Sequence, residues 1–452
     1  MIFRFNIFLS IFLFLIFILS IEGTIALRYL LTVLLLIILI FKKTLHVGLF
    51  RKINSNKQYK NIVLVLLIFL LYVLIHTFFL SHNLVWSIDE WRAQILYPVV
   101  FFFIGNAIAY HVKFYKLISP RSFIKLIFFA LFLHIIYVDM RGLHHLIQSG
   151  EMLNRFGGLM SSPVLANYIT NIVIAILTSE YIYRLRTGHR FMNLSNGFLH
   201  LALISCIFSA FVESLRLGDI SLVLLGLSAA ILFAYRNSSF TVGKKTIITS
   251  AIVVILTVPL AYNISTDPRW GKLKETIPLA INTSSSRHWV NENLDAPKTK
   301  SGYEVKGSNY ERVAWAKKGL DFVIENPWGI GFGRNSFGHS LYINMPEERE
   351  FIHVGQTSHS SIIDLTIGIG LLGTSLWVMF IFYVAYSSAK IFFNNHNYFA
   401  ILAIFLSVGF FSRGLVDANM RDHMLVQFMI LLGITLFFLF SDEDYFEKDI
   451  PN

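Results

Sequence analysis

The chain consists largely of apolar runs close to twenty residues long, separated by polar connections. An α-helix needs about twenty apolar residues to cross the hydrocarbon core of a membrane. The runs are apolar on every face, whereas the strands of a transmembrane β-barrel alternate apolar and polar residues in shorter segments. We therefore expect an all-α integral membrane protein with about twelve transmembrane helices. The expected spans are 5–21, 25–41, 61–80, 94–111, 122–140, 164–183, 196–213, 217–235, 246–263, 362–389, 397–411 and 424–440.

Basic residues collect in every second connection between these spans. The connections 42–60, 113–121, 184–190 and 236–245 each carry several lysines or arginines, and the connections between them carry few. Because lysine and arginine favour cytoplasmic loops, we expect these connections in the cytoplasm together with both termini. The remaining connections then lie on the opposite side of the membrane.

The polar stretch 213–218 is interpreted as a tight external hairpin between two neighbouring spans. A single helix over 196–235 is the alternative. That helix would place the basic connection 236–245 outside, which the distribution of positive charge disfavours.

One connection, 264–361, is much longer than the others, at about a hundred residues, and is expected outside. Its tryptophans and phenylalanines favour a folded element over a linker. Ser308 followed by Glu311 is typical of a capping box and predicts a helix over about 308–326. The expected apolar stripe of this helix is Val313, Ala316, Leu320 and Val323.

The chain is thus expected to have four parts. Residues 1–263 form nine spans, 264–361 the external loop, 362–440 three further spans, and 441–452 a short acidic cytoplasmic tail.

Composition agrees with a membrane protein. Of the 452 residues, 55% are hydrophobic and 14% charged, against about 25% charged in a soluble domain. The net charge of +11 is spread over the basic connections, and no nucleic acid partner is expected. The single cysteine, Cys206, lies in an apolar run and excludes a disulfide within one chain or a cysteine-based metal site.

Arginines at the external ends of spans are candidates for function, because a charge near the membrane is costly unless it is paired or lines a cavity. Arg216 lies in the hairpin, where Glu213 or Asp219 could orient it. Arg312 lies near the positive end of the helix predicted over 308–326. A guanidinium there, together with free backbone amides, can bind phosphate oxygens.

His359 is the candidate general base. It ends the long loop just before a span, within the Thr-Ser-His-Ser-Ser stretch 357–361. A neutral imidazole is the usual general base near neutral pH. His339 and His353 in the same loop are the alternatives.

Further charges are expected on the same side as possible substrate-binding residues: Arg155, Arg413, Asp417 and Arg421. Several arginines, a histidine and an aspartate suit a substrate that carries a pyrophosphate. No His-x-x-x-His or Glu-x-x-His pair is expected on an external helix, and no glycine-rich phosphate loop follows a strand. Acidic pairs such as Asp89–Glu90 or Glu347–Glu348 could hold a divalent cation, but such pairs are common on protein surfaces. Neither a metal nor a nucleotide cofactor is expected.

Six stretches together resemble the O-antigen ligase and polymerase superfamily of bacterial envelope glycosyltransferases, over about 60% of the chain. Their order and spacing around one large external loop carry the resemblance. The stretches are 155–163 before a span, 213–216 in the hairpin, 312–315 leading to the Asn-Pro-Trp-Gly stretch at 326–333, and Ser-His-Ser-Ser at 358–361 running into 369–373.

The resemblance implies a GT-C-like fold of about twelve spans in the bacterial inner membrane, with the active site in the periplasm. Ligases of this superfamily transfer a glycan from undecaprenyl pyrophosphate to lipid A-core and invert the anomeric centre. They use neither metal nor nucleotide. By this resemblance His359 is the base for the acceptor hydroxyl, Arg216 and Arg312 bind and stabilise the pyrophosphate, and Asp417 matches an implicated late acid.

An O-antigen ligase is therefore the first hypothesis for function. The closest alternative is the polymerase of the same superfamily, in which donor and acceptor are both lipid-linked repeat units. A protein O-oligosaccharyltransferase is a further alternative. A transporter or flippase would also have about twelve spans, but inverted repeats and interrupted helices would be expected there, and no repeat is evident in the sequence.

Overall fold

The computed structural model describes residues 6–42, 56–160, 162–213, 273–300, 302–305, 307–331, 335–420 and 422–441. It confirms the all-α expectation, because the β pairing among these residues is one isolated bridge between Lys298 and Glu304. Within the described residues, eight helical segments are long and apolar enough to cross a membrane, and two shorter apolar helices precede them. The expected spans 217–235 and 246–263 and the hairpin after Glu213 lie outside the described residues.

The two short helices are α1 (Ile7–Ile18) and α2 (Ile25–Phe41). The eight longer segments are α4 (Lys57–Phe79), the run from α5 (Leu84–Trp91) through η1 (Arg92–Leu96) to α6 (Tyr97–Phe114), α7 (Pro120–Ser149), α8 (Pro163–Thr187), α9 (Asn196–Glu213), α16 (Ser361–Asn395), α17 (Tyr398–Val416) and α18 (Asp422–Phe440). All ten apolar runs expected within the described residues are therefore helices.

The described basic connections share one end of the bundle. Tyr59, at the start of α4, stacks on Phe440, at the end of α18, with ring centroids 5.2 Å apart. In the connection between α8 and α9, Phe191 stacks on Tyr398 at the start of α17 and lies 5.9 Å from the Arg121 guanidinium carbon at the start of α7. The alternation of sides predicted from charge is thus reproduced by these helices.

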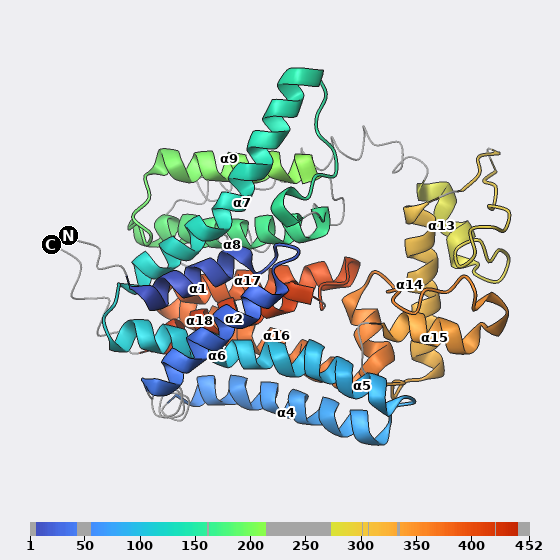
Figure 1. The fold of residues 1–452 in the computed structure, drawn as a ribbon, viewed down its shortest axis with the longest axis horizontal. Coiled ribbons are helices and arrows are strands. Elements are labelled where there is room, and N and C mark those ends of the chain that lie inside the picture. The colour runs from blue at the N-terminus through green and yellow to red at the C-terminus, as the bar shows by residue number, and fades with distance from the viewer. Residues whose placement is uncertain are drawn as a thin grey trace.

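At the opposite end lies a cap of shorter helices, which Figure 1 shows as α13, α14 and α15 beyond the end of the bundle. The cap contains α13 (Leu273–Ile281), α14 (Ser308–Glu325), α15 (Ser336–Asn344) and η3 (Pro346–Glu348). Apolar side chains from these elements and their connections form a second core, joined by Ile367 of α16: Ala280, Trp289, Val290, Val305, Tyr310, Ala314, Phe322, Ile330, Phe337, Leu341 and Ile352. The aromatic residues of the long loop thus fold against the bundle.

Several helix boundaries differ from the expectation. The segment expected at 94–111 begins at Leu84, because the Asn83 side chain caps α5 by accepting from the Trp86 amide at 3.1 Å. The helix expected at 122–140 continues to Ser149. Hydropathy marks only the part of a helix that crosses the apolar layer, so polar extensions beyond that layer escape it.

Two details predicted for α14 are wrong. The helix begins at Ser308 itself, and Gly307, with φ 89°, occupies the cap position that was predicted for Ser308. The buried face includes Tyr310, Ala314 and Phe322, whereas Leu320 is 50% exposed. Val313 and Val323 of the expected stripe do pack against the core of the cap, so the buried face overlaps the expected one but excludes Leu320.

α16 is broken at Gly370, where φ is 72° and ψ is 176°. The connection after α14 supplies the hydrogen bonds that the helix loses. The Ile330 amide donates to the Ile367 carbonyl and the Leu371 amide to the Pro327 carbonyl, both at 2.9 Å. Irregular backbone at membrane depth is tolerated where protein satisfies it. The described part of the first glycine-containing stretch, 326–331, therefore packs against the second, 369–373.

Replacing Gly370 with alanine is expected to destabilise the protein. An added Cβ would lie 2.5 Å from the Trp328 carbonyl carbon and oxygen, and a positive φ costs a residue with a side chain about 1–2 kcal/mol before any clash. The melting temperature in detergent should fall by several degrees. Gly197→Ala, in α9 with nothing within 4 Å of the added carbon, should leave it nearly unchanged. Equal melting temperatures for the two variants would contradict this packing role.

Candidate active site

His359 occupies a turn held rigidly at the start of α16. Its φ of 58° is uncommon for a residue with a side chain, although histidine is among those that tolerate it. The Ser358 amide donates to Oδ1 of Asp364 at 2.9 Å, and the Ser360 amide donates to Oγ of Ser358 at 3.2 Å. Strained backbone persists where its surroundings fix it, and such positions concentrate at functional sites.

The cap helix α14 packs directly on this turn. The Trp315 ring stacks on the His359 imidazole, with centroids 5.2 Å apart and planes 15° from parallel. Trp315 is fixed in turn, because its Nε1 donates to the Trp289 carbonyl at 3.1 Å. One turn later, a Cβ on Gly319 would lie 3.5 Å from Cβ of Ser358. The backbone of α14 therefore lies close to the backbone of the His359 turn.

Arg312 belongs to the same side of α14 as Trp315. Residues three apart on a helix are neighbours on its surface. Arg312 is half-buried, as are Trp315 and His359. The predicted base therefore stacks on a tryptophan that lies three residues after one of the two predicted catalytic arginines on the same helix.

The connection after α17 is bound to the other side of the His359 turn. The Ser361 amide donates to the Asp417 carbonyl at 3.1 Å, and the Met420 amide donates to Oγ of Ser361 at 3.0 Å. The Ser360 hydroxyl donates to the Gly414 carbonyl at 3.4 Å. Asp417 thus lies next to the turn in space, although its side chain is directed into the bundle.

The side chains of Asp417 and Arg413 form a buried ion pair of 3.0 Å, with 6% and 1% of each side chain exposed. Arg413 also donates to Oδ1 of Asn167 at 2.8 Å, and Asn167 donates to Oε2 of Glu213 at 3.0 Å. Oε1 of Glu213 accepts from the Thr170 hydroxyl at 2.8 Å. One continuous polar chain therefore crosses α17, α8 and the end of α9 directly behind the His359 turn.

The other predicted site residues are placed as follows. Arg155 is exposed, with φ 56°, in a turn that the Phe156 amide ties to the Val212 carbonyl near the end of α9, at 3.2 Å. Arg216 and Arg421 lie outside the described residues. The structure therefore gathers His359, Arg312, Asp417 and Arg413 at one end of the bundle.

The two alternative histidines are separate from the turn. The ring of His339 lies against that of Trp86, with centroids 4.1 Å apart, and burial lowers the pKa of His339. His353 is exposed and lines a cavity of the cap that Trp315 also lines.

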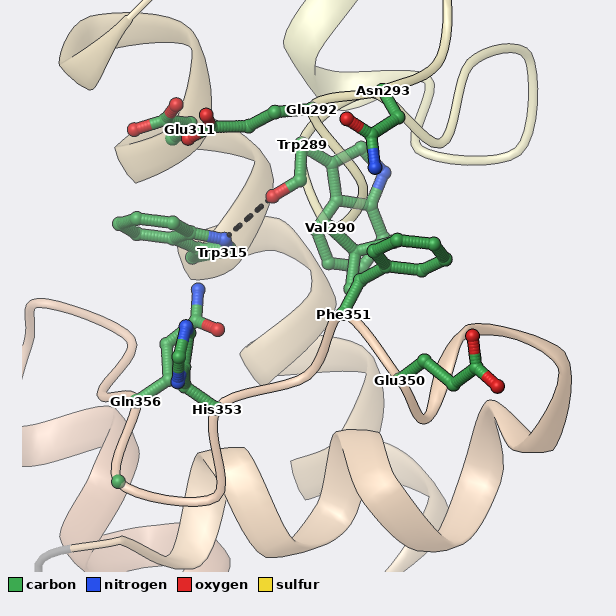
Figure 2. A pocket seen from close by; sticks show the side chains of 11 residues that line it. Trp289, Val290, Glu292, Asn293, Glu311, Trp315, Glu350, Phe351, His353 and Gln356 are labelled. Atoms are coloured by element: carbon green, nitrogen blue, oxygen red, sulfur yellow. Dashed lines mark hydrogen bonds between the residues drawn. The ribbon is translucent and has the colours of Figure 1, made fainter.

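That cavity, shown in Figure 2, has a volume of about 590 Å³. Its lining residues are Trp289, Val290, Glu292, Asn293, Glu311, Trp315, Glu350, Phe351, His353, Gly355 and Gln356. Burial and the nearby Glu292 carboxylate raise the pKa of Glu311. Trp315 is the residue common to the cavity and the His359 turn.

Sequence reasoning missed several residues that build this region. Asn167 and Thr170 are polar residues within an apolar span, and that contrast is the signal that could have found them. Arg28 is a similar case: it is 5% exposed in α2, donates to the Leu19 carbonyl at 2.9 Å and contacts His423. Trp315 gave no such signal, because nothing in its sequence context distinguishes it from a core tryptophan.

Comparison with protein families identifies the central part of the chain. Residues 201–378 match the family described as O-antigen ligase. The matched region contains most of α9, the cap and the first part of α16, and so includes Arg312 and His359. Among curated proteins, no match to the chain was found. The chain therefore carries an O-antigen ligase family domain and is a multi-pass membrane enzyme of the glycosyltransferase class.

Proposed function

We propose that the protein is an O-antigen ligase. It transfers a glycan from undecaprenyl pyrophosphate to lipid A-core at the periplasmic face of the bacterial inner membrane, with both termini in the cytoplasm. The observation that carries the proposal is the meeting of α14, the His359 turn and the α17 connection at the end of the bundle opposite the basic connections. This meeting supports a site in which His359 acts as the base and the Arg312 guanidinium binds phosphate on a membrane-embedded scaffold.

The proposed reaction is a single displacement. The His359 imidazole takes the proton of an acceptor sugar hydroxyl, and the oxygen attacks the anomeric carbon of the donor. The bond from that carbon to the pyrophosphate oxygen breaks, and undecaprenyl pyrophosphate leaves with the electron pair. Attack opposite the leaving group inverts the anomeric centre. The fixed turn and the Trp315 stack support this role, because a preorganised base avoids reorganisation during the reaction.

Arg312 and Arg216 are proposed to stabilise the charge that develops on the pyrophosphate. A guanidinium offers a planar fork of donors that matches two phosphate oxygens at once. Arg155, Arg421, Arg413 and Asp417 were predicted to bind substrate. Exposed Arg155 is suited to direct contact, whereas buried Arg413 and Asp417 are suited to positioning the His359 turn.

Arg312→Lys tests the importance of the guanidinium geometry. The lysine keeps the charge but loses the two-pronged contact, so the transfer rate should fall on the order of 10–100-fold. Lys318→Arg, a conservative change on the same helix, should leave the rate within about twofold of the original, because no role in the site is assigned to Lys318. A transfer rate unaffected by Arg312→Lys would show that only net charge matters at this position.

The break in α16 is the feature that a transporter would share. In transporters, interrupted helices direct free backbone groups at the substrate. Here the amides of Ile330, Gly331 and Leu371 close the break with hydrogen bonds of 2.9 Å to surrounding carbonyls. The interruption therefore serves to join the cap to the bundle, which favours an enzyme.

The deciding experiment uses the purified protein in proteoliposomes with undecaprenyl-pyrophosphate-linked glycan and lipid A-core. A glycan covalently joined to lipid A-core supports the ligase. Lipid-linked polymer formed without use of the acceptor would identify a polymerase instead. Glycan moved across the bilayer with its donor bond intact would identify a transporter, and either of these two results would overturn the proposal.

A further inference from the structure

The cavity of the cap has no part in the displacement described above. Its volume of about 590 Å³ lies within the range of about 300–1,000 Å³ typical of small-molecule sites. It is formed by α14 together with the connections that precede it and follow α15 (Figure 2). Such a cavity next to the proposed base can hold part of a substrate.

The lining combines aromatic rings with hydrogen-bond acceptors. Trp289, Trp315 and Phe351 supply apolar surface, and Asn293 and Gln356 supply amides. Three carboxylates, Glu292, Glu311 and Glu350, also line the cavity, whereas its described lining contains no lysine or arginine. Carboxylates accept short, strong hydrogen bonds from hydroxyl and ammonium groups and repel anions.

Glu292 and Glu311 lie close together on one wall, as Figure 2 shows. Burial and the Glu292 charge raise the pKa of Glu311, and the smaller opposing effects of His288 and Arg312 do not cancel this, so the two carboxylates repel each other on this wall. A ligand that donates hydrogen bonds to both carboxylates would relieve that repulsion. A ligand with its own carboxylate or phosphate would increase it.

Resting on the proposed function, we propose that this cavity binds an uncharged or amino-substituted sugar residue of the glycan substrate and discriminates against acidic sugars. A sugar presents hydroxyl donors at its edge and an apolar face of C–H groups, which matches carboxylates flanked by aromatic rings. Because Trp315 lines the cavity and stacks on His359, a bound sugar also helps to hold the base in place.

The direct test measures sugar binding to the purified protein by saturation-transfer NMR. The probes are the methyl glycosides of glucose, glucosamine and glucuronic acid. The first two should bind the native protein, and Glu292→Lys should weaken that binding at least tenfold. Asp295→Lys, the same change at an exposed acid outside the cavity, should leave it unchanged. Equal melting temperatures of the two variants would show that both are folded.

Transfer kinetics then identify the substrate that occupies the cavity. In Glu292→Lys, the KM of either the donor or the acceptor should rise at least tenfold, with kcat nearly unchanged, and the affected substrate is the one bound there. Preferential binding of the glucuronide to the native protein, or unchanged binding and KM in Glu292→Lys, would overturn the inference. Glycoside binding without any glycan transfer would reject the ligase but retain the sugar site, so the two failures are distinguishable.

Discussion

Replacing His359 with asparagine is expected to reduce the rate of glycan transfer by roughly 10²–10⁴-fold, the usual contribution of a general base. Asparagine tolerates the positive φ of 58° at this position, so the turn and the start of α16 should be preserved. The measurement is product formation by the purified variant at saturating donor and acceptor. An unchanged melting temperature would show that the loss comes from chemistry.

The other two histidines of the loop provide matched controls for this variant. His339→Asn and His353→Asn should each retain at least about a tenth of the native rate, because neither ring takes the proton in the proposed displacement. His353 lines the sugar cavity, so its replacement can raise a KM. Full activity of His359→Asn combined with loss of activity in one of the controls would transfer the role of base to that histidine.

Replacing Arg413 with methionine is expected to lower the free energy of unfolding by about 3–5 kcal/mol, the usual cost of removing one partner of a buried ion pair. Asp417, which is only 4% exposed, would remain charged after losing its ion-pair partner. Oδ1 of Asn167 would lose the Arg413 donor that lies 2.8 Å away. The loss should appear as a lower denaturant midpoint in mixed micelles. Transfer should also weaken, because the Asp417 backbone holds the His359 turn.

Arg92→Met is the matched control for this change. Arg92 forms an ion pair of 3.2 Å with Asp89, but the side chains are 72% and 63% exposed. Exposed pairs contribute about 0–1 kcal/mol, so this variant should unfold almost as the native protein does. Equal midpoints for Arg413→Met and Arg92→Met would contradict a structural role for the buried pair.

Much of the helical fold could be predicted from the sequence, because a membrane requires long apolar runs. The ten runs expected within the described residues are all helices. The distribution of lysine and arginine also indicated which helix ends lie together at one end of the bundle. Boundaries were less predictable, since the helical segment expected from 94 begins at Leu84, where the Asn83 side chain caps α5. The break at Gly370 also escaped prediction, because its stability depends on a connection some forty residues earlier in the sequence.

The charged residues of the candidate site could be chosen from the sequence, whereas the residues that hold them in place could not. Arg312 and His359 could be chosen from residue type and position, but the stacking of His359 on Trp315 depends on how α14 packs on α16. That packing also placed Leu320 at the surface, against the expected stripe. Arg413 and Asp417 were chosen for their charge, whereas their burial depends on partners such as Asn167, which lies 246 positions away in the sequence.

Glycan transfer to a periplasmic acceptor requires the cap and the His359 turn to lie outside the cytoplasm. Side-specific labelling tests this most directly, because the single Cys206 can be replaced by alanine and single cysteines introduced at exposed Asp295 in the cap and exposed His189 between α8 and α9. In intact spheroplasts, a membrane-impermeant maleimide should label Asp295→Cys. It should label His189→Cys only after the spheroplasts are lysed. Labelling of His189→Cys before lysis, with Asp295→Cys protected, would place the proposed active site in the cytoplasm and contradict its assignment as an O-antigen ligase.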